Sequence, residues 1–434
     1  MKMITKRGIF LWIMSLAFVV GLVFMTVSLV QNGDTWVMKR FNHHVYSNGE
    51  LIGAGTIYDK DGDVLAETKD GDRVYSDSAT TRKSTLHVVG DPKNFISTGV
   101  QSVYSARLTG YSLLFGVHNI QKYGKGNDLK LTIDRDICDE AYKALDGRKG
   151  TVGIVNYKTG DIVCSVSSPS YDVEDVPDNL LTSERYEGVY INRLLGAHYV
   201  PGSTFKLVTA ICAIENIPDI YSREWVCDGE YQPESGVAIK CNANHGKHIN
   251  FKDALAKSCN SAFAQIASVG MSAILGQEKL ATTAKELGIG SAVTVSGTID
   301  SYAGYFDATD KIKLGVDALG WTGIGQGNTR IAPITMLRIV AAVANGGNAV
   351  SFNIVDSLAN QAGKALDFTL PSNQLSMMNS DVAAKLKEMM RYNVTNHYGE
   401  SRYKGLNLCA KSGTAQIDSD ESHNIAWFVG FMDD

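Results

Sequence analysis

The stretch that most constrains this chain is a run of 22 residues without a charge, from Ile9 to Val30. An α-helix needs about 20 consecutive apolar residues to cross the hydrocarbon core of a bilayer. The run is too long for the apolar core of a typical signal peptide, and no small-x-small cleavage site follows it. A buried helix of a soluble domain fits poorly, because of the length and the flanking Lys6 and Arg7. The run therefore predicts an uncleaved transmembrane helix over residues 9–30.

The charges around this run predict its orientation. Residues 1–8 carry Lys2, Lys6 and Arg7 and no acidic residue. Positive flanking charge is retained on the cytoplasmic side of a membrane. We therefore expect a cytoplasmic tail over residues 1–8, a single pass through the cell membrane, and an extracytoplasmic body from residue 31 onward.

The composition is that of a folded protein with a large core. The 434 residues are 44% hydrophobic and 20% charged, and the length allows two or three domains. The formal net charge is -5, and the part after the apolar run is more acidic still because the basic tail lies before it. An acidic body gives no support for nucleic-acid binding.

The seven cysteines do not form a disulfide framework, because their number is odd and no Cys-x-x-Cys occurs. Cys227 and Cys241 could pair in an oxidising compartment. Together with His245 and His248 they also form a candidate zinc set, but the spacing Cys-x13-Cys-x3-His-x2-His matches no standard zinc finger. We expect a loop with incidental thiols and imidazoles, and neither a metal ion, an obligatory disulfide nor any other cofactor.

The remaining patterns predict a mixed α/β body. Residues 56–65 read as a hairpin around an Asp-Gly turn, within a small, loop-rich module. A strand over 129–134 leads into a helix over 137–145, and strands over 151–156 and 161–166 form a second hairpin. Two further antiparallel strands are expected over 408–415 and 425–431, where the sequence ends shortly afterwards.

A serine and a lysine stand three residues apart at the start of an apolar segment, in Pro201-Gly202-Ser203-Thr204-Phe205-Lys206. On a helix that begins near Ser203, residues i and i+3 share a face. A serine hydroxyl becomes a strong nucleophile when a base removes its proton, and a buried lysine has a lowered pKa. Ser-x-x-Lys alone is common by chance and also fits a capping serine followed by a surface lysine.

Two later stretches favour the catalytic interpretation of Ser203 and Lys206. Ser258-Cys259-Asn260 interrupts a helical segment over 251–269, and Lys411-Ser412-Gly413-Thr414 lies in a predicted strand. In this order the three stretches resemble the signature motifs of penicillin-binding proteins. Nearby Gly325-Gln326-Gly327 and Trp427-Phe428-Val429-Gly430 also resemble the family.

The resemblance implies a set of catalytic residues. Ser203 would be the acyl-accepting nucleophile and Lys206 its base. Ser258 would relay a proton between Lys206 and the leaving amine, and Asn260 would hold the amide of the substrate. Lys411 would add positive charge that favours an anionic substrate.

The strand motif supplies the residues implied for substrate binding. Ser412 and Thr414 share a face of the strand, and in the family this pair grips the terminal carboxylate of the peptide. Gly413 would let the substrate backbone lie against the strand. The backbone N–H groups of Ser203 and Thr414 would form the oxyanion hole.

The resemblance implies an α/β (α+β) fold of the penicillin-binding and serine β-lactamase type, an antiparallel sheet flanked by helices. It covers residues 129–434, after an N-terminal pedestal over 31–128. Ala54 stands where the family usually has an arginine, and the family continues after Gly430 with a strand and a helix. Because the sequence ends at Asp434, we expect either a fragment or a domain that closes differently.

These features predict a class B member of the short-pedestal type. Its function would be that of a peptidoglycan D,D-transpeptidase, which cross-links stem peptides through an acyl-enzyme and is a target of β-lactams. D,D-carboxypeptidase, membrane-anchored β-lactamase, β-lactam sensor and inactive scaffold are the alternatives. The resemblance also implies a polytopic membrane glycosyltransferase as partner, in cell elongation, division or sporulation.

Overall fold

The computed structural model describes residues 2–433 except for 48, 114–115, 117–125, 234–235, 271–275, 309–312, 361, 367–372, 418–419 and 421–422. The chain divides into two compact units. Unit 1 comprises Met1–Leu131, Tyr171–Asp178 and Val355–Phe368, and unit 2 comprises Thr132–Ser170, Asn179–Ile354 and Thr369–Asp434.

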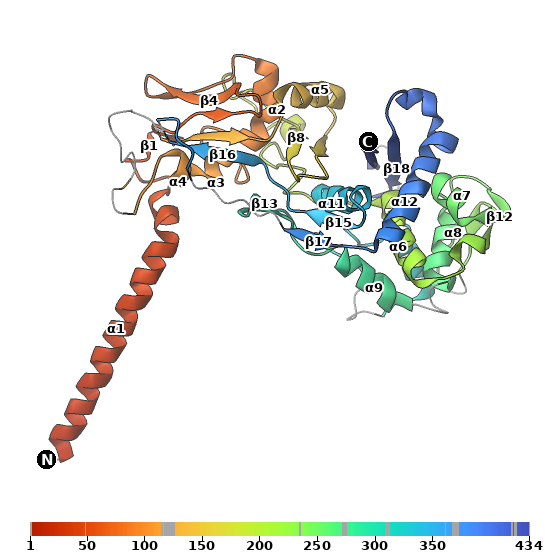
Figure 1. Ribbon diagram of the computed structural model, residues 1–434, viewed down its shortest axis with the longest axis horizontal. Coiled ribbons are helices and arrows are strands. Elements are labelled where there is room, and N and C mark those ends of the chain that lie inside the picture. The colour runs from red at the N-terminus through yellow and green to blue at the C-terminus, as the bar shows by residue number, and fades with distance from the viewer. Residues whose placement is uncertain are drawn as a thin grey trace. The chain divides into compact units, whose positions relative to one another are not determined.

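A single long helix opens unit 1. Helix α1 (Lys2–Val37) includes the predicted apolar run and extends beyond it on both sides (Figure 1). Its apolar side chains are exposed, and its segment Lys6–Val37 has the length and hydropathy of a membrane span. The chain therefore carries one candidate membrane anchor near its N-terminus within the described residues.

The rest of unit 1 is built on a five-stranded sheet in the order β16-β6-β3-β4-β5. Strands β3 and β4 form the predicted antiparallel hairpin, and the buried Asp59 side chain accepts hydrogen bonds from the N–H groups of Asp61 and Asp63 in its turn. Strand β6, which we expected to open the transpeptidase domain, pairs in this sheet with β3 and β16. The elements of unit 1 are α1, β1 (Tyr46–Ser47), β2 (Glu50–Leu51), β3 (Ile57–Tyr58), β4 (Val64–Lys69), β5 (Asp72–Tyr75), α2 (Ala79–Val89), α3 (Val100–Val103), α4 (Ser105–Leu108), β6 (Asp128–Leu131) and β16 (Val355–Ala359).

Unit 2 contains both of the other predicted hairpins. Strands β7 and β8 pair antiparallel, and so do β18 and β19, in a register that places Lys411 opposite Val429. Helix α12 packs against β18 (Figure 1), and the Asn393 side chain at its end donates a hydrogen bond to the Ala410 carbonyl at 2.9 Å. Helix α11 packs against β7 and β19.

The first half of unit 2 includes helix α6 and the corner between helices α7 and α8. Its elements are α5 (Arg135–Leu145), β7 (Gly150–Val155), β8 (Ile162–Ser168), η2 (Glu184–Tyr186), η3 (Gly202–Phe205), α6 (Lys206–Asn216), η4 (Ile220–Ser222), β9 (Glu224–Cys227), β10 (Glu230–Tyr231), β11 (Ile239–Lys240), β12 (Gly246–Asn250), α7 (Phe251–Ala256), α8 (Asn260–Gln265) and the π-helix η5 (Ile266–Gly270).

The second half of unit 2 returns to the β18–β19 pair. Its elements are α9 (Gly276–Glu286), β13 (Thr294–Val295), β14 (Ile299–Asp300), α10 (Val316–Gly323), α11 (Pro333–Ala344), β15 (Asn348–Val350), β17 (Gln374–Ser376), α12 (Ser380–Asn393), the π-helix η6 (Val394–Gly399), η7 (Glu400–Tyr403), β18 (Leu408–Ala415) and β19 (Ile425–Met432).

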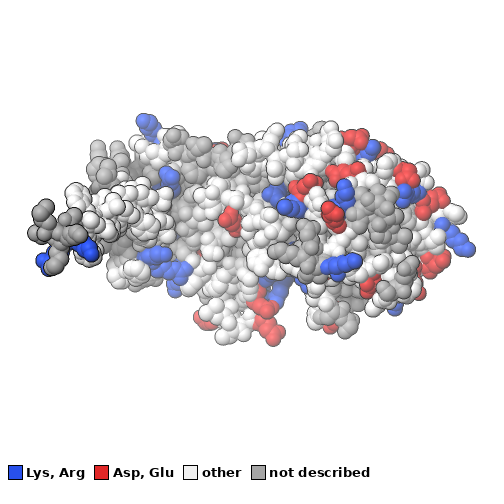
Figure 2. Space-filling view, turned by 90° about the horizontal axis from the view of Figure 1, so that it is seen from below, with Lys and Arg blue, Asp and Glu red and all other residues white. Residues whose placement is uncertain are grey.

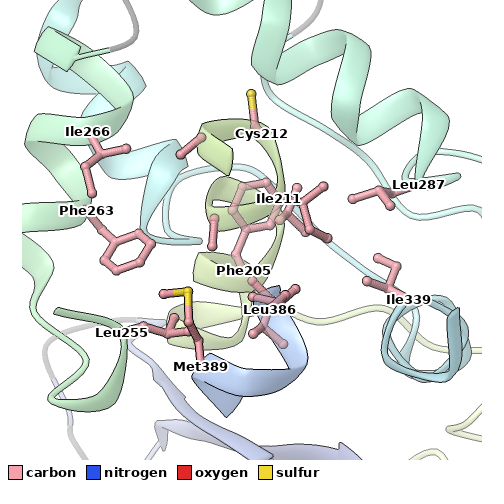
Figure 3. Packing of buried hydrophobic residues seen from close by; sticks show 14 of the residues in the cluster. Phe205, Ile211, Cys212, Leu255, Phe263, Ile266, Leu287, Ile339, Leu386 and Met389 are labelled. Carbon is pink, nitrogen blue, oxygen red and sulfur yellow. The ribbon is translucent and has the colours of Figure 1, made fainter. Parts of the chain in front are cut away.

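Helix α6 lies in the middle of the core of unit 2. Ile211 on α6 is fully buried among side chains from several other helices, which include Phe263, Ile339 and Leu386 (Figure 3). The apolar residues around the whole circumference of α6 explain this position, because such a helix is stable only when it is covered on all sides. The core therefore fixes the helix that carries Lys206.

Figure 2 shows how the charged side chains are distributed on one face of the molecule. Acidic and basic side chains are interspersed over the right-hand part of this face, and the coloured residues form no continuous basic stripe. A basic patch or stripe is the electrostatic footprint of a nucleic-acid-binding protein.

Candidate active site

Ser203 and Lys206 meet at the N-terminal end of the buried helix. Ser203 lies in the short 3₁₀ helix η3, which continues directly into the α-helix α6 at Lys206, so the helical segment begins near Ser203 as predicted and its first turn is 3₁₀. In a 3₁₀ helix, residues i and i+3 are eclipsed. Lys206 Nζ lies 2.7 Å from Ser203 Oγ, within hydrogen-bond distance.

Two glycines bring this turn against strand β18. Gly202 has φ +52°, and a Cβ atom there would lie 2.5 Å from the Thr414 carbonyl oxygen. A Cβ atom on Gly413 would lie 2.9 Å from the Thr204 nitrogen. Side chains at either position would therefore separate the turn that carries Ser203, which we call the nucleophile turn, from the strand. The turn and β18 form one wall of the site.

The second wall is the corner between α7 and α8. Ser258 takes φ +55° at this corner, and its Oγ lies 3.3 Å from Lys206 Nζ and 3.0 Å from Lys411 Nζ. Asn260 Oδ1 accepts a hydrogen bond from Lys206 Nζ at 2.7 Å. Its Nδ2 donates to the Lys240 carbonyl at 2.9 Å. The structure thus brings the first, second and third motifs together around one lysine.

Burial controls the charge of the two lysines. Both are fully buried, and among the described residues neither pairs with a carboxylate. Burial lowers the pKa of Lys206 to about 7, although the nearby thiols of Cys241 and Cys259 act in the opposite direction. Burial, and next the proximity of Lys206, lowers the pKa of Lys411 well below its ordinary value. A neutral lysine amine is thus accessible near neutral pH.

The strand motif has a partner that the sequence did not predict. Tyr398, in the π-helix η6, places its hydroxyl 2.9 Å from the Ser412 backbone nitrogen and 3.1 Å from Ser412 Oγ. Lys411 Nζ donates to the Ser412 carbonyl at 2.6 Å. Thr414 is exposed and Ser412 is half-buried. Tyr398 lies outside all three motifs, so only the fold connects it to them.

The cysteine and histidine residues that we expected to be incidental are gathered behind the second wall. Cys227, Cys241 and His245 are joined by Cys259, and the candidate ligand atoms all lie within 4.8 Å of one another. His248, the fourth member of the set predicted from the sequence, instead places its Nδ1 2.7 Å from a carboxylate oxygen of Glu224.

Most of unit 2 matches a known protein family. Residues 150–434 match the family model described as the penicillin-binding protein transpeptidase domain, which is well over half of the chain. The chain belongs to this family. The penicillin-binding fold that the motifs predicted is therefore confirmed.

Individual relatives agree with the family match. The peptidoglycan D,D-transpeptidase PbpA of Mycolicibacterium smegmatis is 26% identical over 367 residues, which cover 78% of this chain and 72% of the relative. Stage V sporulation protein D of Bacillus subtilis is 24% identical over 70% of this chain, which spans 47% of that protein.

A solved structure shares the fold. Penicillin-binding protein A from M. tuberculosis, solved as a ceftriaxone acyl-enzyme complex, superposes with a TM-score of 0.76 at 24% identity. The match covers 87% of this chain and 89% of that one.

Proposed function

We propose that this penicillin-binding protein is a peptidoglycan D,D-transpeptidase that works through an acyl-enzyme on Ser203. One observation carries the proposal. The Lys206 amine lies 2.7 Å from Ser203 Oγ, is fully buried, and has a pKa lowered to about 7. A base must lie within hydrogen-bond reach of the proton that it removes and must be unprotonated at working pH.

The first half of the reaction forms the acyl-enzyme. Neutral Lys206 takes the Ser203 proton as Oγ attacks the carbonyl carbon of the D-Ala-D-Ala bond. The carbonyl electrons move to the oxygen, where the backbone N–H groups of Ser203 and Thr414 stabilise the developing charge. The tetrahedral intermediate then expels the terminal D-alanine amine, which receives its proton from Lys206 through Ser258.

The second half transfers the acyl group to an acceptor. The acceptor amine attacks the Ser203 ester and loses a proton to Lys206 along the same route, and Ser203 Oγ recovers its proton as the ester bond breaks. Ser258 suits the relay because its Oγ lies within 3.3 Å of both lysine amines. In this half-reaction an acceptor amine gives transpeptidation, and water gives carboxypeptidase action.

Substrate binding is assigned to both walls. Ser412 and Thr414 hold the terminal carboxylate, and Gly413 lets the peptide lie along β18. Burial favours neutral Lys411 in the empty site, and the bound carboxylate favours its protonated form, which then supplies positive potential. Asn260 has one amide hydrogen bonded to Lys240 and retains a second one for the substrate amide.

Two measurements on the full chain in detergent test this function. Labelling with a fluorescent penicillin is expected to be slow to reverse, whereas rapid loss of label would indicate a β-lactamase. A stem-peptide donor with an added amine acceptor should give cross-linked product, and hydrolysis alone would indicate a carboxypeptidase. Ser203→Ala is the control in both assays and should show neither activity.

The proposal includes an anchored enzyme with its N-terminus in the cytoplasm. Lys2, Lys6 and Arg7 precede the apolar helix and support this orientation. Protease added to intact spheroplasts should remove the body, and protection of the body would contradict the orientation. A polytopic membrane glycosyltransferase is the proposed partner. Its recovery with the full chain, and its loss when the anchor is replaced by an unrelated membrane helix, would test that.

A further inference from the structure

Three thiols and one imidazole converge directly behind the Ser258–Asn260 corner. Cys227 ends strand β9, Cys241 follows β11, His245 lies just before β12, and Cys259 is the middle residue of the second motif. Cys227 and Cys259 are fully buried, whereas Cys241 and His245 are half-buried. Three separate segments of unit 2 thus present soft ligand atoms to one point.

Three of the six distances between these ligand atoms match the edges of a tetrahedral zinc site, and all six are within 4.8 Å. With Zn–S bonds of about 2.3 Å and Zn–N bonds of about 2.05 Å, a tetrahedron has edges of about 3.8 Å between sulfurs and about 3.6 Å between sulfur and nitrogen. The Sγ atoms of Cys241 and Cys259 are 3.8 Å apart. His245 Nδ1 lies 3.4 Å from Cys227 Sγ and 3.5 Å from Cys241 Sγ.

Backbone donors already point at two of the sulfurs. The Asn260 N–H donates to Cys241 Sγ and the Ala262 N–H donates to Cys259 Sγ, each at 3.3 Å. Hydrogen bonds of this kind hold metal-bound thiolates in place and are a regular part of the outer shell of a metal site.

We infer that Cys227, Cys241, His245 and Cys259 bind one zinc ion that fixes the second wall of the active site. Four protein ligands fill the tetrahedron, so the site is structural and leaves no position open for substrate. This inference replaces our sequence-based expectation that no metal is needed, because the fold exchanges the exposed His248 for Cys259.

The ion would act through two neighbouring catalytic positions. Cys259 separates Ser258 from Asn260, and Asn260 is bonded to Lys240 and Cys241 through its side chain and its backbone. Ser258 holds a left-handed backbone conformation, which is unfavourable for a residue with a side chain. Coordination of the zinc ion by Cys259 would hold the corner in the position that places Ser258 and Asn260 beside Lys206.

Metal analysis of the purified full chain tests the site itself. We expect one zinc per chain, and a Co²⁺-exchanged form with thiolate-to-cobalt charge-transfer absorption. His245→Ala and Cys241→Ser should weaken zinc binding by at least about a hundredfold, beyond the range for outer-shell partners. The matched controls His248→Ala and Cys212→Ser should keep the metal. A chain that holds no zinc after zinc-replete purification, or that has a disulfide within the cluster, would overturn the inference.

The positioning role is tested on unmodified protein, so that a misfolded variant cannot decide the result. Zinc removed with a chelator should lower the melting temperature and slow penicillin acylation at least tenfold, and zinc but not Mg²⁺ should restore both. This effect on acylation rests on the proposed function. Unchanged acylation by the stripped protein would refute the positioning role, whereas zinc binding without any acylation of Ser203 would refute the proposed function and leave the metal site intact.

Discussion

The two walls of this active site are held in place by different means. The nucleophile turn meets β18 through the two glycines Gly202 and Gly413, and α6 behind it lies in the apolar core. The Ser258–Asn260 corner is instead held by polar contacts. Asn260 donates hydrogen bonds to the Lys240 carbonyl and to Cys241 Sγ, and we infer that Cys259 binds a zinc ion. Steric changes should therefore disable the first wall, whereas removal of the zinc ligands should disable the second.

The largest effect is expected where the walls meet, at Lys206. Lys206→Arg should slow penicillin acylation by at least about a hundredfold, because guanidinium stays protonated and cannot act as the base. The second-order acylation rate of folded protein is the measurement. Lys411→Arg is the control and should lose less, since that site mainly needs positive charge. A rate for Lys206→Arg within tenfold of the parent would show that another group takes the proton.

A smaller loss should follow from pushing the first wall apart. The Cβ atom of Gly202→Ala would lie 2.5 Å from the Thr414 carbonyl, and φ at this position is +52°. A misplacement of about 1 Å can cost about a hundredfold in rate, so we expect a loss of between about tenfold and a hundredfold. Gly346→Ala is a closer backbone match, with φ +63° and nothing within 4 Å of the added Cβ atom, and should leave acylation unchanged. Equal losses in both variants would show that backbone strain, rather than the contact with β18, is responsible.

The pH dependence of acylation sharpens the role of burial. Only the neutral amine of Lys206 accepts a proton, and its folded pKa is lowered to about 7. The rate should therefore rise with pH, by about tenfold between pH 6 and pH 8, and level off above that. Stopped-flow acylation across this range is the measurement. A profile that still rises steeply above pH 9 would mean that burial does not lower the pKa of this lysine.

The smallest expected effect concerns the strand side of the first wall. Tyr398→Phe removes the hydroxyl that lies within hydrogen-bond distance of Ser412 Oγ and the Ser412 N–H. A hydrogen bond contributes about 1 kcal/mol, so acylation should fall about fivefold. The loss is expected in apparent substrate binding more than in the maximal rate. Tyr403→Phe on the neighbouring η7 serves as control, and an equal loss there would contradict a specific role for Tyr398.

Local pattern was enough to predict much of this molecule. Turn chemistry and alternation predicted the hairpins β3–β4, β7–β8 and β18–β19. The three motifs predicted which side chains converge at the candidate site, because the resemblance is carried by residue type and order. The start of the helical segment near Ser203 was predicted, but its 3₁₀ first turn was not, and such turns are frequent at the ends of α-helices.

Contacts between segments that are far apart in the chain could not be predicted from the sequence. Tyr398 and Ser412 belong to different elements, and so do Cys227 and Cys259. Their spacing along the chain follows no local period, and only the packing of α8 against β9 and β11 brings Cys259 beside Cys241. The zinc set predicted from spacing alone therefore included the nearby His248, which the fold directs to Glu224.

Peptide mapping of the acylated protein identifies the residue that carries the acyl group. The full chain is treated with penicillin, digested, and analysed by mass spectrometry, with Ser203→Ala treated in parallel. We expect one adduct per chain, on the peptide that contains Ser203, and none in the variant. An adduct on another residue, or an equal adduct in Ser203→Ala, would contradict it.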